Sequence, residues 1–417
     1  MIIARLFSFF RLLSRWSVIT LGVAIPLSTA LDNILLGLLL MLVLVSNSRD
    51  VWLTLKHNSV ARACILLFAA LLVGTAYGHA SLKEAVGTLS KYADLALVPL
   101  LMVAMRTTET RQRIMLGFLT TMLITAVLSW LVGLHILPVT QWMWRGCSPE
   151  NPAIFRSSIT QSILMAYAAY ILALQARDAL LPRTRWLLAG LAVVAGSDVL
   201  FMVQGRTGYL VMLALLIYFI WTTAAQRFNR QGRNIGWRTG AGISILSLVL
   251  VMSTYLISPR LHQQMDKIVT EFQAWQPNTA NETSTGERLE FYYNTQAIIK
   301  QHPMLGVGTG GFYAAYAQQI EGKGLIPTRN PHNEYLLITA QLGLAGLALM
   351  FYLFYTQWQQ AAKLAGPFQQ NAARGLLLSV ALASLFNSPL LDHTEGLFFA
   401  FMSALWFVDL GTDKKYA

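Results

Sequence analysis

The chain is organised around two polar stretches, STGERLEFYYNTQAIIKQHPMLGVGTGGFYAAY at residues 284–316 and TRNPHNEYLLITAQLGLAG at residues 328–346. They end the longest polar interruption in a sequence that is otherwise rich in apolar runs. Arg288 and His332 each stand near the start of a predicted helix. We therefore expect the apolar helices before and after this segment to be scaffold, and the segment itself to carry the chemistry.

The composition excludes an ordinary soluble protein. Of the 417 residues, 55% are hydrophobic and only 12% are charged, and the mean hydropathy is positive. These values predict an all-α polytopic membrane protein. A formal net charge of +12 would suggest nucleic acid in a soluble chain. Here the cations cluster in short loops between apolar runs, which is typical of the positive-inside rule, so we expect no nucleic-acid partner.

The apolar runs predict about 12 transmembrane helices, at roughly 20 residues for each crossing of a ~30 Å hydrocarbon core. About two thirds of the 31 Lys and Arg then fall on the face that holds both termini, and we predict that this face is cytoplasmic. Three regions follow: helices in 1–257, a periplasmic loop of short helices in 258–332, and the last three helices with a cytoplasmic C-terminus in 333–417. The predicted spans are 16–30, 32–47, 62–78, 86–105, 114–134, 158–176, 186–203, 206–224, 239–257, 333–355, 373–388 and 395–411.

One apolar run is too long for a single membrane span, so we predict that it contains two. From Trp186 to Trp221 the sequence is almost continuously apolar, and as a single helix it would be ~54 Å long, far beyond the ~30 Å core. The break signal is the sequence QGRTG at residues 204–208, so we predict an external turn there. An arginine at the bilayer centre costs at least ~2.5 kcal/mol, and such residues usually face a cavity or a partner. Arg206 therefore either lines an outward-facing polar site or reaches lipid headgroups.

The loop has a helical pattern of its own, with an amphipathic helix at 259–275 and a second helix at 286–301. The second helix opens with Ser284-x-x-Glu287, a capping-box pattern, and stops before a proline. Arg288 then lies in its first turn, on one face with Phe291, Tyr292 and Thr295. The planar donor fork of arginine suits phosphate oxygens. The alternative is a surface cation that packs on Tyr292.

Two further motifs follow this helix. The sequence GVGTGG at 306–311 is similar to a phosphate loop, but no strand precedes it and no P-loop lysine is present, so we predict a tight turn. In Asn330-Pro331-His332, Asn330 is the predicted N-cap of the next helix and Pro331 its first residue. His332 would then lie at the positive end of the helix dipole, which favours a neutral imidazole and a proton acceptor. The alternative is a histidine that only caps the helix.

The remaining candidates are weaker. Lys91 lies inside the fourth predicted span, where it either faces a cavity or pairs with Asp94. Arg145 and Arg156 flank an external loop whose aromatic residues are typical of membrane-interface anchors. Residues 392–395 contain Asp392, His393 and Glu395, which could contact an acceptor, but we expect a solvated loop there.

The motifs together resemble the O-antigen ligase family. The resemblance also includes about 12 spans with one large external loop before the last three. It is specific for the wider superfamily of ligases and O-antigen polymerases, and less so between them. It is carried by Gln204-Gly-Arg206-Thr-Gly-Tyr-Leu210, Gly286-Glu-Arg288-Leu-Glu-Phe291, His302-Pro-x-x-Gly306-Val-Gly308 and His332-Asn-Glu-Tyr-Leu with Gly343-Leu-Ala-Gly346.

This resemblance implies a bacterial inner-membrane glycosyltransferase of the C type (GT-C). It would move O-antigen from undecaprenyl pyrophosphate to the lipid A core on the periplasmic side, among membrane lipids and without metal or other cofactor. Arg206 and Arg288 would hold the pyrophosphate and His332 would act at the acceptor hydroxyl. The predicted substrate-binding residues are Arg206, Arg288, Lys91, Arg145, Arg156, Tyr292 and Asn333.

The residues are compatible with that chemistry. Two arginines could stabilise a departing pyrophosphate as charge builds on it, and the sequence has no D-x-D-like or His-rich cluster for a divalent cation. We expect no carboxylate nucleophile near the arginines, which favours inversion over a covalent intermediate. The alternatives are an O-antigen polymerase, a protein O-oligosaccharyltransferase and, from another class, a polytopic transporter with discontinuous helices.

Overall fold

The computed structural model describes residues 2–78, 80–231, 236–279 and 283–410. Within them the regular secondary structure is helical, apart from one isolated β-bridge between Ser148 and Asn151. The helices are α1 (Ile2–Ala24), α2 (Thr29–His57), α3 (Ser59–Tyr77), α4 (Leu82–Lys91), α5 (Ala93–Ala104), α6 (Thr108–Gly133), α7 (Ser158–Asp178), α8 (Pro182–Ser197), the π-helix η1 (Asp198–Met202), α9 (Arg206–Arg230), α10 (Trp237–Ile257), α11 (Pro259–Ala274), α12 (Ser284–Gln301), α13 (Phe312–Gln319), α14 (Glu334–Ala361), α15 (Pro367–Ala383) and α16 (His393–Phe407).

The chain is a polytopic membrane protein, as the composition predicts. In the described part, eight helical segments are long and apolar enough to cross a bilayer. Helices α1, α10, α15 and α16 lie at the other predicted positions, but the count of 12 spans is not confirmed. The eight segments are Thr29–His57, Ser59–Tyr77, Leu82–Ala104, Thr108–Gly133, Ser158–Asp178, Pro182–Met202, Arg206–Asn229 and Glu334–Ala361.

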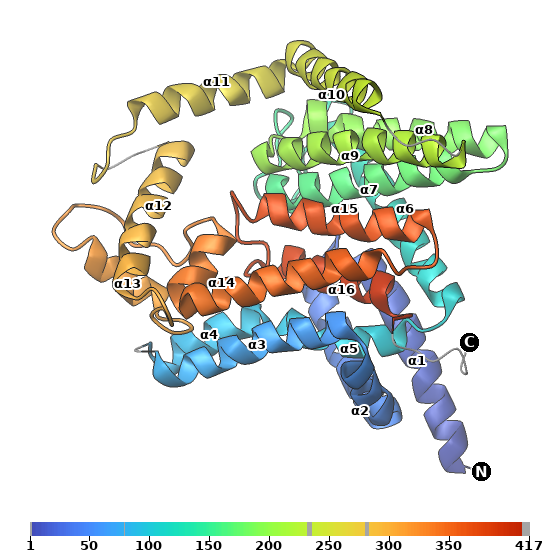
Figure 1. Ribbon diagram of the computed structural model, residues 1–417, viewed down its shortest axis with the longest axis horizontal. Helices are drawn as coiled ribbons and strands as arrows, with labels where there is room; N and C mark the ends of the chain where they lie inside the picture. The colour runs from blue at the N-terminus through green and yellow to red at the C-terminus, as the bar shows by residue number, and fades with distance from the viewer. Residues whose placement is uncertain (1, 79, 232–235, 280–282, 411–417) are drawn as a thin grey trace.

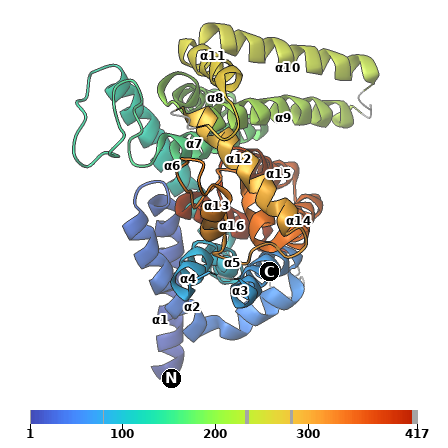
Figure 2. The same ribbon diagram turned by 90° about the vertical axis from the view of Figure 1, so that its left-hand side faces the viewer.

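The helices pack around a core in which α7 and α16 are almost entirely buried. Many outward-facing side chains are large and apolar, among them Ile34, Leu116 and Trp186. Such a surface is stable against lipid and would be unfavourable in water. Figure 1 shows α11, α12 and α13 gathered at the end of the bundle where α14 begins, and Figure 2 views the molecule from that end.

The predicted turn between two apolar helices is confirmed. The π-helix η1 ends at Met202 and α9 begins at Arg206, with Gly205 in extended backbone as its N-cap. The fourth predicted span differs, because it is broken at Tyr92, which separates α4 from α5. Lys91 is therefore the exposed last residue of α4 and does not lie inside a continuous helix.

The glycine-rich segment 306–311 forms the predicted tight turn, with Gly306, Gly308 and Gly310 all at positive φ. It docks into α14 where Gly343, at φ 65°, interrupts the helix. The interruption frees main-chain carbonyls, and the N–H groups of Val307 and Gly308 donate to the carbonyls of Ala340 and Gln341, each at 2.9 Å. This turn fixes the C-terminal side of α12 to the membrane helices.

Candidate functional site

Arg206 is the first residue of α9 and points toward the loop helices. Its Nε donates to Gln264 Oε1 at 2.9 Å on α11, and its Nη1 donates to Thr285 Oγ1 at 2.7 Å on α12. The side chain is 21% exposed, so it is partly shielded but reachable. Of the two interpretations from the sequence, the contacts favour a polar site over lipid headgroups.

Glu271 on α11 completes the surroundings of Arg206. Its Oε2 lies 3.4 Å from Arg206 Nη1 and accepts the Thr285 N–H at 3.2 Å. Burial acts to raise the pKa of Glu271, but hydrogen bonds from Thr285 and Arg206 outweigh it and hold the pKa below its usual value. The expectation that no carboxylate lies near the arginines is therefore wrong, because α11 folds back onto the start of α9.

Arg288 lies on α12, which begins at Ser284, two residues earlier than predicted. The N-cap is Thr283, whose hydroxyl accepts the Gly286 N–H at 3.2 Å, so the predicted capping box at Ser284 is wrong. Among the described residues, the half-buried Arg288 guanidinium has no hydrogen-bond or ion-pair partner. Burial lowers the pKa of Arg288, and the charge of the nearby Arg206 lowers it further. Tyr292 and Glu287 act in the opposite direction and raise it in part. The group remains a cation, which makes it an open anion-binding group.

His332 precedes α14 and is not part of it. The helix begins at Glu334 with Asn333 as its N-cap, so the predicted cap at Asn330 is wrong. His332 has a left-handed backbone, with φ at 55°, a conformation that is unfavourable for a residue with a side chain. Two hydrogen bonds hold it: Asn330 Oδ1 accepts the His332 N–H at 2.8 Å and the Tyr292 hydroxyl donates to the His332 carbonyl at 3.1 Å.

The imidazole of His332 stacks on Phe291 at 6.2 Å between ring centroids. Neither ring nitrogen forms a hydrogen bond in the described part of the chain, so both can contact a substrate. Burial and the charge of Arg288 lower the pKa of His332 to about 4. The imidazole is therefore neutral at pH 7, as the sequence predicts, although the cause is burial beside an arginine and not a position inside the helix.

Tyr292 and Asn333 hold the site together. The Tyr292 hydroxyl lies 3.1 Å from both the His332 and the Leu385 carbonyls, and burial raises its pKa. The Asn333 side chain accepts the Leu336 N–H and donates to the same Leu385 carbonyl at 2.9 Å. These contacts join α12, α14 and the end of α15 around His332.

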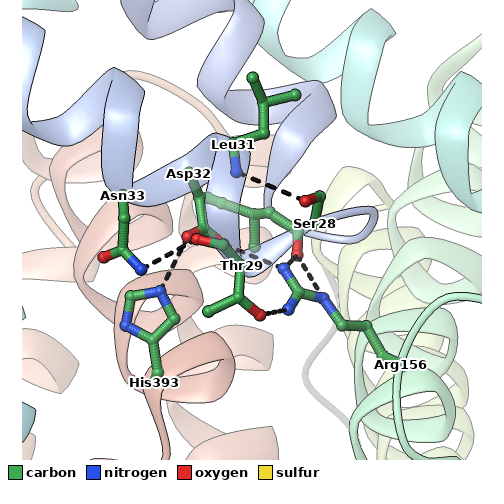
Figure 3. Close-up of polar contacts among 8 residues, drawn as sticks. Ser28, Thr29, Leu31, Asp32, Asn33, Arg156 and His393 are labelled. Atoms are coloured by element: carbon green, nitrogen blue, oxygen red, sulfur yellow. Dashed lines mark hydrogen bonds and ion pairs between the residues drawn. The ribbon is translucent and has the colours of Figure 1, made fainter. Parts of the chain in front are cut away.

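Arg156 lies in a different cluster (Figure 3). Its Nη2 forms a buried ion pair with Asp32 Oδ2 at 2.9 Å and donates to the Ile25 carbonyl at 2.6 Å, and its Nη1 donates to Thr29. On the other side of Asp32, Oδ1 contacts His393 Nε2 at 2.8 Å. Arg156 thus joins the α1–α2 turn to the start of α7, and the structure does not bring it to Arg206, Arg288 and His332.

In the described part of the chain, the other weak candidates, Lys91 and Arg145, form no hydrogen bond or ion pair with the three central residues. Lys91 forms no ion pair with Asp94. Burial raises the pKa of Asp392, and the nearby charge of Lys91 partly opposes that rise. Arg145 is exposed in the α6–α7 connection, which projects from the body in Figure 2. The expected solvated loop at 392–395 is wrong, because Glu395 is buried and accepts the Thr160 hydroxyl at 2.6 Å.

Sequence reasoning missed Gln264, Glu271 and Thr285. All three became functional candidates only because α11 packs against the start of α9 and Thr285, at the start of α12, accepts a hydrogen bond from Arg206. The one available signal was the polar face of the predicted amphipathic helix at 259–275, which indicates no particular partner. Within the described residues, no group of three or more His, Cys, Asp and Glu side chains is arranged to hold a metal ion.

A family model, Wzy_C, described as O-antigen ligase, matches residues 190–351. The matched segment runs from α8 into α14 and contains Arg206, Arg288 and His332. The resemblance read from the motifs is confirmed over these residues. No curated protein matches the chain.

Proposed function

We propose that this protein is a glycosyltransferase that transfers O-antigen from undecaprenyl pyrophosphate to the lipid A core oligosaccharide at the periplasmic face of the inner membrane. The observation that carries the proposal is the pairing of Arg288 with His332. Both side chains are half-buried, both have free hydrogen-bonding atoms, and both lie in the segment that matches the family model.

Arg288 and Arg206 would bind the pyrophosphate of the donor. Arg288 offers a free guanidinium fork, and Arg206 lies near enough to lower the Arg288 pKa. Two like charges without an anion between them repel one another, so an anion bound between them relieves that repulsion. In the transition state the same pair stabilises the charge that collects on the departing pyrophosphate.

His332 would act on the acceptor. The oxygen of the acceptor hydroxyl attacks the anomeric carbon of the donor sugar, the bond from that carbon to the pyrophosphate breaks, and its electron pair stays on the pyrophosphate oxygen. His332 accepts the hydroxyl proton through a free ring nitrogen. Its pKa of about 4 makes it a weak base, but a bound, negatively charged donor would offset the charge of Arg288. Donor binding therefore raises the basicity of His332 before the acceptor reacts.

The reaction is proposed to invert the anomeric carbon. The carboxylate of Glu271 lies beside Arg206, but it is held by Arg206 and by the Thr285 N–H. A carboxylate used in this way is a poor nucleophile, because attack would leave the partly buried Arg206 charge without its carboxylate partner.

Reconstitution in proteoliposomes tests the proposal. Purified protein should transfer O-antigen from undecaprenyl pyrophosphate to lipid A core, and transfer should persist in excess EDTA. Arg288→Ala and His332→Ala should each lower the rate roughly 100-fold or more, because each removes a contact made in the transition state. Lys300→Gln, an exposed cation at the other end of α12, should leave the rate unchanged.

The product separates this function from its alternatives. In cells, loss of a ligase leaves long O-antigen chains on the lipid carrier and a bare lipid A core. Mutant cells whose lipid A core instead carries a single repeat unit would identify a polymerase. Glycosylated protein as the product would identify a protein O-oligosaccharyltransferase, and flux of a glycolipid across vesicles without any new glycosidic bond would identify a transporter.

A further inference from the structure

A cavity lies far along the bundle from Arg288 and His332. Helices α8 and α9 each pack extensively on α7 but scarcely touch each other, and the three run side by side in Figure 1. Between them is a crevice of about 960 Å³, lined mainly by apolar side chains such as Ala192, Met212, Leu215 and Phe219. In a membrane protein the apolar body of such a gap is filled by hydrocarbon, because apolar walls offer water few hydrogen bonds.

One end of the crevice is positively charged. Arg177, Arg185 and Arg227 line it, with Asp178 as the acidic residue among them. A smaller cavity of about 300 Å³ shares Arg177 and Arg185 and continues toward residues 366–369 at the start of α15. The crevice thus has an apolar body and a cationic polar head, the two parts that a phospholipid requires.

Arg177 points to an anionic ligand. Its side chain is only 8% exposed, and its Nε and Nη2 both bond to Asp178 at 2.9 Å. Within the described residues, its Nη1 is buried without a hydrogen-bond partner, and so is Thr223 Oγ1, which lines the same crevice. A buried guanidinium N–H without an acceptor is costly, and a bound phosphate oxygen would satisfy it.

The dimensions fit a single lipid. Along α8 the lining extends from Arg185 to Ser197, which is ~18 Å at 1.5 Å per residue. Half of a ~30 Å hydrocarbon core is ~15 Å, so the crevice accommodates one acyl chain over the full depth of a leaflet. The cationic end is near Arg227, and Arg206 is at the opposite end of α9. A lipid held by these arginines therefore enters from the leaflet opposite to the proposed catalytic site.

We propose that the α8–α9 crevice binds one anionic glycerophospholipid, with its phosphate on Arg177 and Arg227 and one acyl chain along Ala192 and Leu215. The lipid would complete the packing of α8 and α9 on α7, and so support the helix that carries Arg206. This site does not depend on the function proposed above, because lipid binding and sugar transfer are measured separately.

The experiment measures thermal unfolding and native mass spectra of the purified, delipidated protein in detergent micelles that contain dioleoylphosphatidylglycerol or dioleoylphosphatidylcholine. Phosphatidylglycerol should raise the unfolding temperature more than phosphatidylcholine and should appear as one bound lipid. Arg227→Gln removes an exposed cation, and Ala192→Trp fills the apolar part of the crevice. Each should weaken phosphatidylglycerol binding by about tenfold or more.

Arg183→Gln is the matched control, since Arg183 is exposed on α8 next to the mouth but does not line the crevice. It should bind phosphatidylglycerol like the wild type. Equal effects of the two lipids on the wild type, or full phosphatidylglycerol binding by both Arg227→Gln and Ala192→Trp, would overturn the proposal. Displacement of the lipid by undecaprenyl phosphate would assign the crevice to a polyprenyl tail and overturn it as well.

Discussion

The hydroxyl of Tyr292 lies 3.1 Å from the main-chain carbonyl of His332, and this contact ties α12 to the residue that faces the proposed acceptor. It forms at a residue whose backbone is left-handed, with φ at 55°. A conformation of this kind costs on the order of 1–3 kcal/mol and persists only where its surroundings enforce it. We infer that Tyr292 positions His332, and its role as a substrate contact stays a prediction.

Tyr292→Phe should lower the turnover of transfer by about fivefold with little change in donor KM. The change removes one hydrogen bond to the His332 loop, worth about 1 kcal/mol, and leaves the ring in place. Tyr293→Phe is the control, because Tyr293 is exposed and its hydroxyl has no partner in the described part of the chain. A tenfold rise in KM at unchanged turnover would show that the hydroxyl binds the donor directly.

Glu271→Gln should lower the donor KM by about two- to fivefold. The carboxylate of Glu271 competes with pyrophosphate for Arg206, and a partly exposed pair of this kind contributes up to ~1 kcal/mol. Asp266→Asn, an exposed change on the same helix α11, should have no effect. If Glu271→Gln abolished turnover, the carboxylate would have a chemical role, and a covalent intermediate should then be sought.

Arg288→Gln should raise the pKa of His332. Burial and Arg288 together lower that pKa to about 4 from a usual value near 6.5, and the substitution removes the second cause. The wild-type imidazole therefore stays neutral down to about pH 5, whereas in the variant it begins to protonate at a higher pH. Carbon-13 NMR of labelled histidine, assigned with His332→Gln, gives the pKa directly, and an unchanged value would mean that burial acts alone.

The predicted orientation can be tested by labelling. A cysteine introduced by Gln276→Cys should react with a membrane-impermeant thiol reagent added from the periplasm, and one introduced by Asn229→Cys should not. Positions 276 and 229 are both exposed. The native Cys64 and Cys147 are buried, and replacing them with serine removes any labelling of native thiols. Labelling of the two positions in the opposite pattern would invert the topology and place the Arg288 site in the cytoplasm.

The arrangement of helices could largely be predicted, because apolar runs of membrane length and charged loops are local properties of the sequence. The turn before Arg206 followed from length alone. Neither Glu271 as a partner of Arg206 nor Asp32 as a partner of Arg156 could be predicted, since each pair joins helices far apart in the chain. The left-handed backbone of His332 was missed for another reason. Asn330 and Asn333 are both good N-caps, and a helix that began after Asn330 would have included His332. Only the tertiary contacts select Asn333 and leave His332 outside the helix.

The interruption of α14 at Gly343 has a consequence for how this protein can be divided. A membrane helix tolerates a break only where other protein groups take up its free carbonyls, and here the 306–311 turn does so. A β-carbon at Gly343 would lie 2.2 Å from the main chain of Met304, so no larger residue fits without displacing that turn. The segment between α10 and α14 is thus packed into the membrane helices and is not an independent domain attached to them. Excised as a soluble fragment, it would lose the surface that defines its fold.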